Sequence, residues 1–523
     1  MFVPLDCDFA TIPALIGQHA AQAPRRVALV QGERSLDYAG LDALMDRVAG
    51  ALQRDGWGPG DTIAICAGMS IHYLALFMGA LRAGLAVAPL APGSDASSLA
   101  RMVVDARTRC VFVDAVGAAA MGPALPTAAP RIAVDGSDVA TSLDHWLQGA
   151  NTPLRVVDIE PAWPFNIIYS SGTTGAPKGI VQSHGMRWTH VRRGATYGYG
   201  ADTVTLLSTP LYSNTTLVVF FPTISCGGTI VLMPKFDALG YLELAQRHRA
   251  THTMLVPVQY QRLMAHPEFD RFDLSSFQFK FSTSAPFGAA LKADVLERWP
   301  GGLVEFYGMT EGGGTCILEA HRYPHKLHTV GLPAQGHDIR LIDDNGVEVA
   351  LGEAGEVVGH SAGMMTGYHR QPDKTREAEW FDPTGKRFIR TGDIGRFDDD
   401  GFLILFDRKK DMVISGGFNV YPSDLEAVLR QHPAVADVAV VGVPSERWGE
   451  TPVAFVVLRD AAAQAVLADD LLQWTNAQLG KMQRLGDLQL CSELPRSAIG
   501  KVLKRELRAA YGGASSTSET PAS

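Results

Sequence analysis

The chain has 523 residues, of which 46% are hydrophobic and 19% charged, a balance that excludes wholesale disorder and predicts several folded domains. Its 46 Lys and Arg residues against 55 Asp and Glu residues give a formal charge of −9. This charge argues against a nucleic-acid-binding protein or a basic membrane-surface protein.

The six cysteines show neither CxxC spacing nor companion histidines, so we expect no zinc site and no disulfide framework. The start of the sequence lacks the cationic stretch of a signal peptide, and no apolar run reaches the ~18 residues of a membrane span. We therefore expect a cytoplasmic protein without a transmembrane segment.

The first 150 residues predict strands that alternate with helices. Short apolar runs at residues 61–66, 84–89 and 110–114 predict buried strands, and residues 71–83 carry apolar side chains at helical spacing. Such alternation is typical of parallel sheets that are covered by helices on both faces. Residues 115–130 are rich in Ala, Gly and Pro and predict a surface connection.

The same alternation continues to about residue 341 and then gives way to short strands and turns. The charge run at residues 407–411 stands between two apolar runs, and we interpret it as an interdomain linker in preference to a solvated turn. Beyond it, the pattern predicts an α+β unit whose helix, two strands and second helix lie at residues 422–431, 435–443, 452–458 and 471–479. Residues 512–523 are rich in Ser, Thr, Gly and Pro and predict a disordered tail.

The strongest local signal is the loop at residues 165–179, FNIIYSSGTTGAPKG, which follows an apolar strand. Its hydroxyls, glycines and Lys178 can direct backbone N–H groups and one cation toward an anion such as phosphate. It is not a Walker A motif, because Pro177 and Gly179 stand where that motif needs glycine and Ser or Thr. The order of strand, hydroxyl–glycine run and Pro-Lys-Gly favours a phosphate loop over a flexible turn.

Residues 171–179 resemble the signature loop of the adenylate-forming superfamily of acyl-CoA synthetases, luciferase-type enzymes and adenylation domains of nonribosomal peptide synthetases. Further family motifs follow in the same order between about residues 25 and 508, with a pattern most similar to acyl-CoA ligases of the fatty acid or aryl acid type. The resemblance implies an α/β fold, with a large N-terminal domain of layered parallel-rich sheets and a small β-barrel-like subdomain. We expect an ATP- and acid-binding domain at 1–409, a mobile α+β lid domain at 410–511 and a tail at 512–523.

The resemblance also implies a nucleotide site. The Tyr307 ring would stack near adenine, Thr310 would contact the α-phosphate, and Glu311 would help to hold Mg²⁺, which prefers carboxylate and phosphate oxygens. Asp393 would accept hydrogen bonds from the ribose hydroxyls, with Arg408 beside it. The residues expected to bind ATP or coenzyme A are Ser170, Ser171, Gly172, Thr173, Thr174, Gly175, Lys178, Ser284, Ala285, Pro286, Tyr307, Asp393, Arg408, Ser415, Gly416 and Gly417.

In the LPRSAIGK segment, Lys501 resembles the catalytic lysine of the family and is expected to act together with Thr310 and Glu311. Its ammonium would stabilise the charge that develops between the attacking carboxylate and the α-phosphate. The resemblance implies two half-reactions, formation of an acyl-adenylate with release of pyrophosphate and transfer of the acyl group to a thiol with release of AMP. Between them, the lid domain would rotate about Lys410 and bring Ser415 to Gly417 beside the pantetheine arm.

Free coenzyme A is the favoured thiol, because no carrier domain follows the lid domain; loading of a separate carrier protein is the alternative. A luciferase-type oxygenation is not favoured. A binding protein without activity is disfavoured, because Lys178, Glu311, Asp393 and Lys501 are all present. The expected partner is a small-molecule carboxylic acid, and a homodimer is left open.

The residues expected to line the acyl pocket are Trp188, Tyr212, Ser213, Asn214, Ser282, Thr283, Gly308, Gly312 and Gly313. The glycines after Glu311 would leave the pocket floor open, and Trp188 and Tyr212 would wall it, which favours an aromatic, phenylpropanoid or medium-chain acid. Many relatives place a histidine at the position of Ser213, so gating of the thioester step by histidine is not expected.

One alternative for the acid remains, and another is disfavoured. Arg262 would bind the second carboxylate of a dicarboxylate such as malonate, although an arginine on a helix surface is the commoner interpretation. Activation of an amino acid is disfavoured, because no aspartate that could hold an ammonium group stands at residues 220–224.

Overall fold

The computed structural model describes residues 7–122, 129–149, 154–170, 178–415, 418–445, 447–459, 466–480, 483–497 and 500–515. The chain forms two compact units, here called unit 1 (Met1–Ile339 with Gly359–Ile389) and unit 2 (Arg340–Val358 with Arg390–Ser523). It therefore passes from one unit to the other three times. The domain boundary expected at residues 409 and 410 concerns the lid hinge and stays a prediction.

One sheet of unit 1 has eight strands and is parallel from β8 to β7, with β9 and β19 added antiparallel. Its strands in spatial order are β19 (Gly367–Tyr368), β9 (Lys178–Ser183), β8 (Pro164–Ser170), β4 (Ala86–Pro89), β3 (Thr62–Cys66), β5 (Thr108–Val113), β6 (Arg131–Ala133) and β7 (Thr141–Ser142). The strands predicted in the first 150 residues lie here, and each is buried on both faces.

The second sheet of unit 1 has nine strands, parallel in its middle and antiparallel at both edges. Its strands in spatial order are β16 (Leu332–Pro333), β15 (Thr315–Glu319), β14 (Gly302–Gly308), β13 (Phe279–Ser282), β12 (His252–Leu255), β10 (Val204–Leu207), β11 (Thr229–Leu232), β1 (Val27–Gln31) and β2 (Arg34–Asp37).

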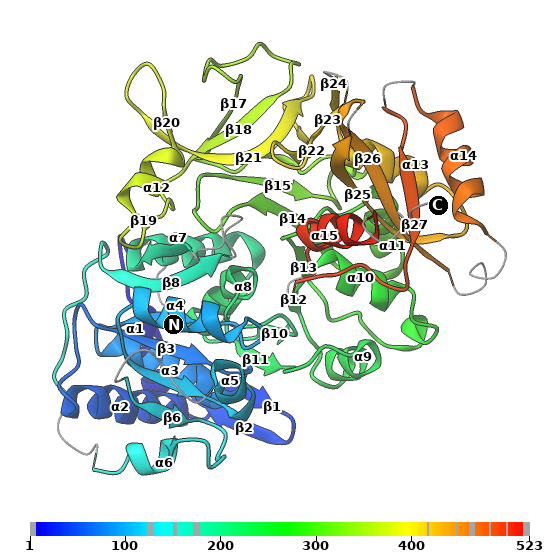
Figure 1. Ribbon diagram of the computed structural model, residues 1–523. Coiled ribbons are helices and arrows are strands. Elements are labelled where there is room, and N and C mark those ends of the chain that lie inside the picture. Colours follow the sequence, from blue (N-terminus) through cyan, green and yellow to red (C-terminus); the bar gives the residue numbers. More distant parts are fainter. Residues whose placement is uncertain are drawn as a thin grey trace, which may run out of the picture. The chain divides into compact units, whose positions relative to one another are not determined.

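Helices cover both faces of these two sheets, as the alternating pattern predicts (Figure 1). The largest core cluster combines inward side chains of both sheets with α1 (Ile12–Gln22), α2 (Tyr38–Arg54), α3 (Ile71–Arg82), α7 (His184–Gly194) and α8 (Asn214–Ser225). On the other face of the eight-stranded sheet lie α4 (Ala96–Asp105) and α5 (Ala115–Met121). Unit 1 also contains α6 (Leu143–Trp146), α9 (Ala238–Arg247), α10 (Pro257–Met264), α11 (Ala289–Arg298), α12 (Pro372–Glu377) and the 3₁₀ helices η1 (Ala195–Tyr197), η2 (Phe269–Arg271) and η3 (Pro324–Lys326).

A five-stranded sheet contains the points at which the chain changes unit. Its strands are β17 (Asp338–Ile342), β18 (Gly355–His360), β21 (Arg387–Phe397), β20 (Glu379–Phe381) and β22 (Leu403–Arg408), the last paired with β21. Among the described strands the pairing forms an open path. The subdomain expected to resemble a β-barrel is therefore an open sheet.

The remaining sheet of unit 2 confirms the predicted α+β unit. Its strands are β24 (Phe418–Val420), β23 (Val413–Ser415), β26 (Gly449–Leu458), β25 (Val435–Ser445) and β27 (Asp487–Leu490). Alternate residues of β25 point to opposite faces, as strand geometry requires. Val438 and Val440 pack with α13 (Pro422–Leu429) and α14 (Ala468–Gln478), whereas Ala439 and Val441 pack with Leu507 of α15 (Lys504–Ser515) (Figure 1).

Two local predictions need correction. The connection expected at residues 115–130 begins as helix α5, because the Asp114 side chain caps it by accepting a hydrogen bond from the Gly117 amide at 2.7 Å. Gly117 allows α5 to lie directly on β3, since a Cβ there would come within 1.8 Å of the Cys66 carbonyl oxygen. Residues 512–515, expected to belong to a disordered tail, are the end of α15, and residues 516–523 lie outside the described residues.

All six cysteines are free, and those at positions 66, 110, 226 and 316 are buried. Within the described ranges, no helix combines the length and the apolar character needed to cross a bilayer.

Candidate active site

The structure brings Lys178 and Glu311 together through a residue that the sequence did not single out, Tyr368 of β19. The Tyr368 hydroxyl donates a hydrogen bond to Glu311 Oε1 at 2.9 Å, and Lys178 Nζ lies 5.1 Å from the centroid of the Tyr368 ring. Burial, and then the Glu311 carboxylate, raise the pKa of Tyr368 well above its usual range, so the phenol stays a donor. The Met365 amide also donates to the Glu311 carbonyl oxygen at 2.7 Å, which fixes the backbone at the end of the Tyr-Gly-Met-Thr-Glu motif of residues 307–311.

Glu311 suits the metal role expected of it. Oε2 of this carboxylate accepts no hydrogen bond from any described residue, so one oxygen is available to a hard cation. Across the described residues, no three His, Cys, Asp or Glu side chains gather as a ligand set. A single carboxylate with one oxygen available fits Mg²⁺, which commonly uses one or two carboxylates and completes its shell with substrate phosphates and water.

Thr310 is positioned by Gln182 of β9, whose amide nitrogen donates to the Thr310 carbonyl oxygen at 2.7 Å. The side-chain oxygen of Gln182 accepts a hydrogen bond from Arg187 of α7. Arg187 is fully buried, and its five hydrogen bonds go to the neutral side chains of Asn166, Gln182, His190 and Asn214. Burial lowers the pKa of Arg187 to about 9.

The segment at residues 282–287, expected to line the adenine pocket and here called the adenine segment, meets the predicted acyl pocket at the start of α8. Ser213 caps this helix by accepting from the Thr215 amide at 3.3 Å, and the hydroxyls of Thr215 and Ser284 lie 2.5 Å apart. Ser284 has a φ of +82°, a left-handed conformation that is rare for a serine and is found most often at functional sites. The serine that replaces the usual histidine thus has a structural role as a helix cap.

The reason predicted for Gly312 and Gly313 is wrong. A Cβ at Gly312 would come within 2.0 Å of the Gly363 carbonyl oxygen, and one at Gly313 within 2.5 Å of Ile389 Cβ. These glycines therefore let two backbone segments pack closely, and they do not leave a floor open. Glycine is equally required at Gly314, where a Cβ would come within 2.3 Å of Ile339 Cδ1.

The other residues expected in the acyl pocket differ in burial. Trp188 is 3% exposed and packs in the large core cluster, and Ser282 is fully buried on β13. Tyr212, Asn214 and Thr283 are half-buried, whereas Gly308 is exposed. Of the adenine segment, Ala285 is half-buried and Pro286 exposed. Their contact with substrate stays a prediction.

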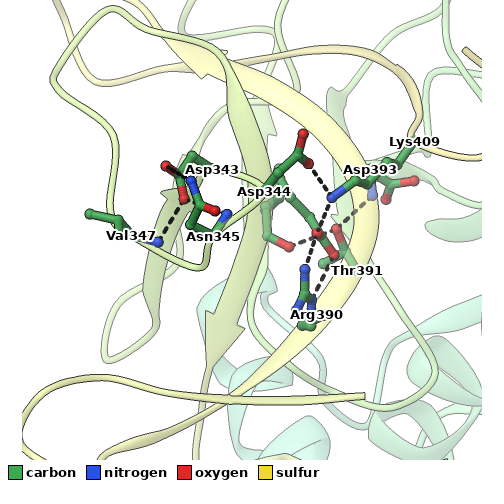
Figure 2. Close-up of polar contacts among 10 residues, drawn as sticks. Asp343, Asp344, Asn345, Val347, Arg390, Thr391, Asp393 and Lys409 are labelled. Atoms are coloured by element: carbon green, nitrogen blue, oxygen red, sulfur yellow. Dashed lines mark hydrogen bonds and ion pairs between the residues drawn. The ribbon is translucent and has the colours of Figure 1, made fainter. Parts of the chain in front are cut away.

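In unit 2, a network of charges supports the strand that carries Asp393 (Figure 2). Arg408 Nε lies 3.3 Å from Asp393 Oδ1, and the ribose-binding role of the two residues stays a prediction. Glu356, only 5% exposed, accepts from Arg390 Nη2 at 2.6 Å and lies 3.3 Å from Lys409 Nζ, which is 2.6 Å from Asp344. The Thr391 hydroxyl accepts from the Asp393 amide at 3.0 Å and completes the support.

Glu356→Gln is expected to destabilise unit 2 by about 1.5–3 kcal/mol at pH 7, the usual contribution of hydrogen bonds to charged groups. Burial raises the pKa of Glu356, but Arg390 and Lys409 together outweigh it and leave the pKa below its ordinary 4.5. The stabilisation is therefore complete above about pH 4.5 and is lost as the pH falls through the lower native value. Urea unfolding of the wild type and of Glu356→Gln at a series of pH values checks this prediction. Asp344→Asn, which changes the exposed partner of Lys409, serves as the control. A difference that persists unchanged at acid pH would contradict it.

The loop that carries Lys501 is closed by its own backbone. The Ser497 amide donates to the Lys501 carbonyl oxygen at 2.8 Å, and Arg496 donates to the Gly500 carbonyl oxygen at 2.6 Å and to Asp437 at 2.5 Å. Lys501 itself is exposed at the end of this loop. Lys410 lies in an exposed turn after β22, and its role as a hinge stays a prediction.

Ser415 ends β23 and pairs with Gly449, while the neighbouring Ile414 amide donates to Glu450 at 2.9 Å. Ser170 ends β8 opposite Lys178, and Tyr307 lies half-buried on β14. The remaining predicted residues lie outside the described residues, namely Ser171, Gly172, Thr173, Thr174, Gly175, Gly416 and Gly417.

Comparison with known proteins gives matches along nearly the whole chain. Residues 16–369 match the family model of AMP-binding enzymes, and residues 424–501 match that of the AMP-binding enzyme C-terminal domain. A feruloyl-CoA synthase from an Amycolatopsis species is 31% identical over 95% of this chain and 98% of its own length. The fatty acid–[acyl-carrier-protein] ligase ScoC from Streptomyces coeruleorubidus is 30% identical over 95% of both chains. The crystal structure of ATP-bound MatB from Rhodopseudomonas palustris is 29% identical, with a TM-score of 0.86 over 96% of this chain and 99% of that one.

Proposed function

Because this chain belongs to the family of AMP-binding enzymes, the adenylate-forming superfamily, we propose that it is an ATP-dependent acid–CoA ligase. Enzymes of this family are acid–thiol ligases, and this chain is one of them. In the proposed reaction, a carboxylate oxygen attacks the α-phosphorus of ATP and expels pyrophosphate. A thiolate of coenzyme A then attacks the acyl carbon and expels AMP.

The observation that carries this proposal is the contact of Lys178, Tyr368 and Glu311. These residues come from the end of the phosphate loop, from β19 and from the Tyr-Gly-Met-Thr-Glu motif, and they meet within unit 1. Glu311 would hold Mg²⁺ together with the phosphates of ATP, and the bound ion would supply positive charge to offset that of pyrophosphate. Tyr368 keeps the carboxylate in place and presents its ring to the Lys178 ammonium.

The residues of unit 2 supply the rest of the chemistry in this proposal. Asp393 and Arg408 would bind the ribose, and Lys501 would stabilise charge at the reacting α-phosphate in the first half-reaction. Rotation of the lid domain about Lys410 would then exchange Lys501 for the segment after Ser415, which serves the thioester step.

Coenzyme A as the thiol is supported by the likeness to feruloyl-CoA synthase, and ATP by the likeness to ATP-bound MatB. The likeness to ScoC, whose name gives an acyl carrier protein as its acceptor, favours a second candidate in which the acyl group passes to a separate carrier protein. The two candidates share the first half-reaction and differ only in the thiol.

The test is release of pyrophosphate and AMP across a panel of carboxylic acids, with and without coenzyme A. We expect acid-dependent pyrophosphate release and sustained AMP release only when coenzyme A is present. Pyrophosphate release without thioester formation would favour the carrier-protein candidate. Silence with every acid would contradict an acid ligase of either kind.

A further inference from the structure

Helix α7 places two arginines, Arg187 and Arg193, in very different environments. Arg187 makes all the hydrogen bonds that a guanidinium can make, yet each of its partners is uncharged. Arg193, less than two helical turns further on, has no hydrogen-bond or ion-pair partner among the described residues and is only partly exposed. The helix therefore brings two positive charges into unit 1 without a counterion in the part of the chain that the structure describes.

Two histidines lie with these arginines. His190 Nδ1 is 3.3 Å from Arg187 Nη1, and His337, between β16 and β17, has Nδ1 2.9 Å from the Thr315 amide. A guanidinium and a backbone amide can only donate, so both Nδ1 atoms must accept. In each neutral imidazole the proton therefore resides on Nε2, which makes Nε2–H a donor.

The groups that act on the two histidines are all basic. Burial, then the charges of Arg187, Arg193 and His337, lower the pKa of His190 well below its usual value. Burial, then Arg193 and His360, lower the pKa of His337 to about 4, so both rings are neutral at pH 7. Burial also lowers the pKa of Arg193. The acidic group that acts on Arg193 electrostatically is the Tyr197 phenol, whose own pKa is raised by burial.

A carboxylate near this cluster is already engaged. Glu319 acts on Tyr197 but is paired with Arg322 at 3.0 Å. A basic residue in the last turn of α7 interacts favourably with the helix dipole, but the exposed Arg192 already provides this interaction. The dipole therefore does not explain why Arg193 is mostly buried. An inward cation that lacks a counterion is costly, and such groups are concentrated at sites that bind an anion.

The cluster adjoins the residues of the proposed acyl site. Arg187 donates to Asn214 at 2.8 Å and to Gln182, which in turn holds Thr310. His337 holds the amide of Thr315, which pairs with Gly308 across the β14–β15 hairpin that carries the Tyr-Gly-Met-Thr-Glu motif. Each of His190, Arg193 and His337 keeps some exposed surface and is therefore accessible to a ligand.

We propose that Arg193, His190 and His337 bind a second carboxylate at the far end of the substrate, so that the enzyme activates dicarboxylic acids. Arg193 provides the charge and a fork of donors that matches a carboxylate, and the two Nε2–H groups complete the set. The fixed charge of Arg187 adds attraction without contact. This assignment rests on the proposed function and moves the dicarboxylate site from Arg262, which is exposed on α10, to α7.

The test compares acids that differ only in the distal group, namely octanoate with octanedioate, benzoate with terephthalate, and 3-phenylpropanoate with its 4-carboxy derivative. We expect the wild-type kcat/KM for the best diacid to exceed that for its partner by about 10²-fold or more, because a site built for a polar group rejects analogues that lack it. Arg193→Met should lower kcat/KM for the diacid by about 10²–10³-fold and change that for the monoacid by less than about 3-fold. Arg192→Met, the matched change on the exposed side of α7, should leave both values unchanged.

Thermal unfolding separates binding from stability. Without substrate, Arg193→Met should unfold at the same temperature as the wild type or higher, because the change removes an unpaired charge. The diacid should raise the unfolding temperature of the wild type and of Arg192→Met but not that of Arg193→Met.

A wild type that prefers monoacids, or an Arg193→Met variant that keeps its diacid activity, would overturn the proposal and leave the ligase function standing. If no acid supports AMP release, the proposed function fails, and the diacid-dependent thermal shift still decides the carboxylate site. Absence of that shift in the wild type would then overturn the proposal as well.

Discussion

Lys501→Ala is expected to slow formation of the acyl-adenylate by about 10²–10³-fold, the usual loss when one preorganised donor is removed from a developing charge. The lysine ammonium is a compact charge, and Ser497 and Arg496 close the backbone loop on which it stands. Because this support does not depend on the Lys501 side chain, the variant should fold normally. Acid-dependent pyrophosphate release measures the loss.

The second half-reaction provides the control for this variant. Acyl-adenylate supplied from outside should be converted to the thioester by Lys501→Ala at nearly the wild-type rate, since the proposed mechanism uses Lys501 only for adenylation. Arg505→Ala removes an exposed cation four residues away and should affect neither step. Equal losses in both half-reactions would show that Lys501 acts through the fold or through both steps.

Arg187→Met is expected to lower the free energy of unfolding of unit 1 by about 1–3 kcal/mol for each buried acceptor that loses its donor. The change leaves the side-chain oxygens of Asn166, Gln182 and Asn214 without their donor. It also removes the guanidinium from its position 5.2 Å from the ring centroid of Phe221 and 5.9 Å from that of Phe165. Because Arg187 holds Gln182, which in turn holds Thr310, these two residues of the proposed active site should lose their positions first.

Two units need not unfold in one step, so denaturation is best followed together with amide hydrogen exchange in α7 and β8. Protection there should fall in Arg187→Met while that of β25 and β26 in unit 2 is unchanged. Arg187→Lys should recover only part of the loss, because an ammonium cannot reproduce the planar fork. Arg192→Met should cost less than about 0.5 kcal/mol, as is usual at the surface, and an equal effect of Arg192→Met would contradict the expected role of Arg187.

The buried strands of unit 1 could be read from the sequence nearly to the residue. Continuous apolar runs between turns predicted β3 and β4, and helical spacing predicted α3 to within one residue of its end. Helix α5 was missed, because its Ala- and Gly-rich sequence resembles a connection and its start depends on one cap by Asp114. The barrel-like subdomain was expected from family likeness, and sequence patterns do not reveal whether a sheet closes.

The motifs of the candidate site could be located, whereas the contacts between them could not. Tyr368 stands 57 residues after Glu311 in a short edge strand, so nothing local links the two. Gly312 and Gly313 illustrate the opposite error, because glycine in a motif shows that space is needed and not which atoms fill it. In the same way, the sequence offers three arginines on α7, and only the fold shows that Arg192 is exposed, that neutral side chains engage Arg187 and that no described residue pairs with Arg193.

The interleaved chain path has a consequence for folding during synthesis on the ribosome. N-terminal domains generally fold first as a chain emerges, but unit 1 is incomplete until Gly359–Ile389 has appeared, because Ile389 packs with Ile180, Met365 and Tyr368. Meanwhile Arg340–Val358, already made, must wait for its partners from Arg390 onward. A nascent chain halted between these points would expose the edge of β18 that later pairs with β21, a state that chaperones bind and that aggregates readily.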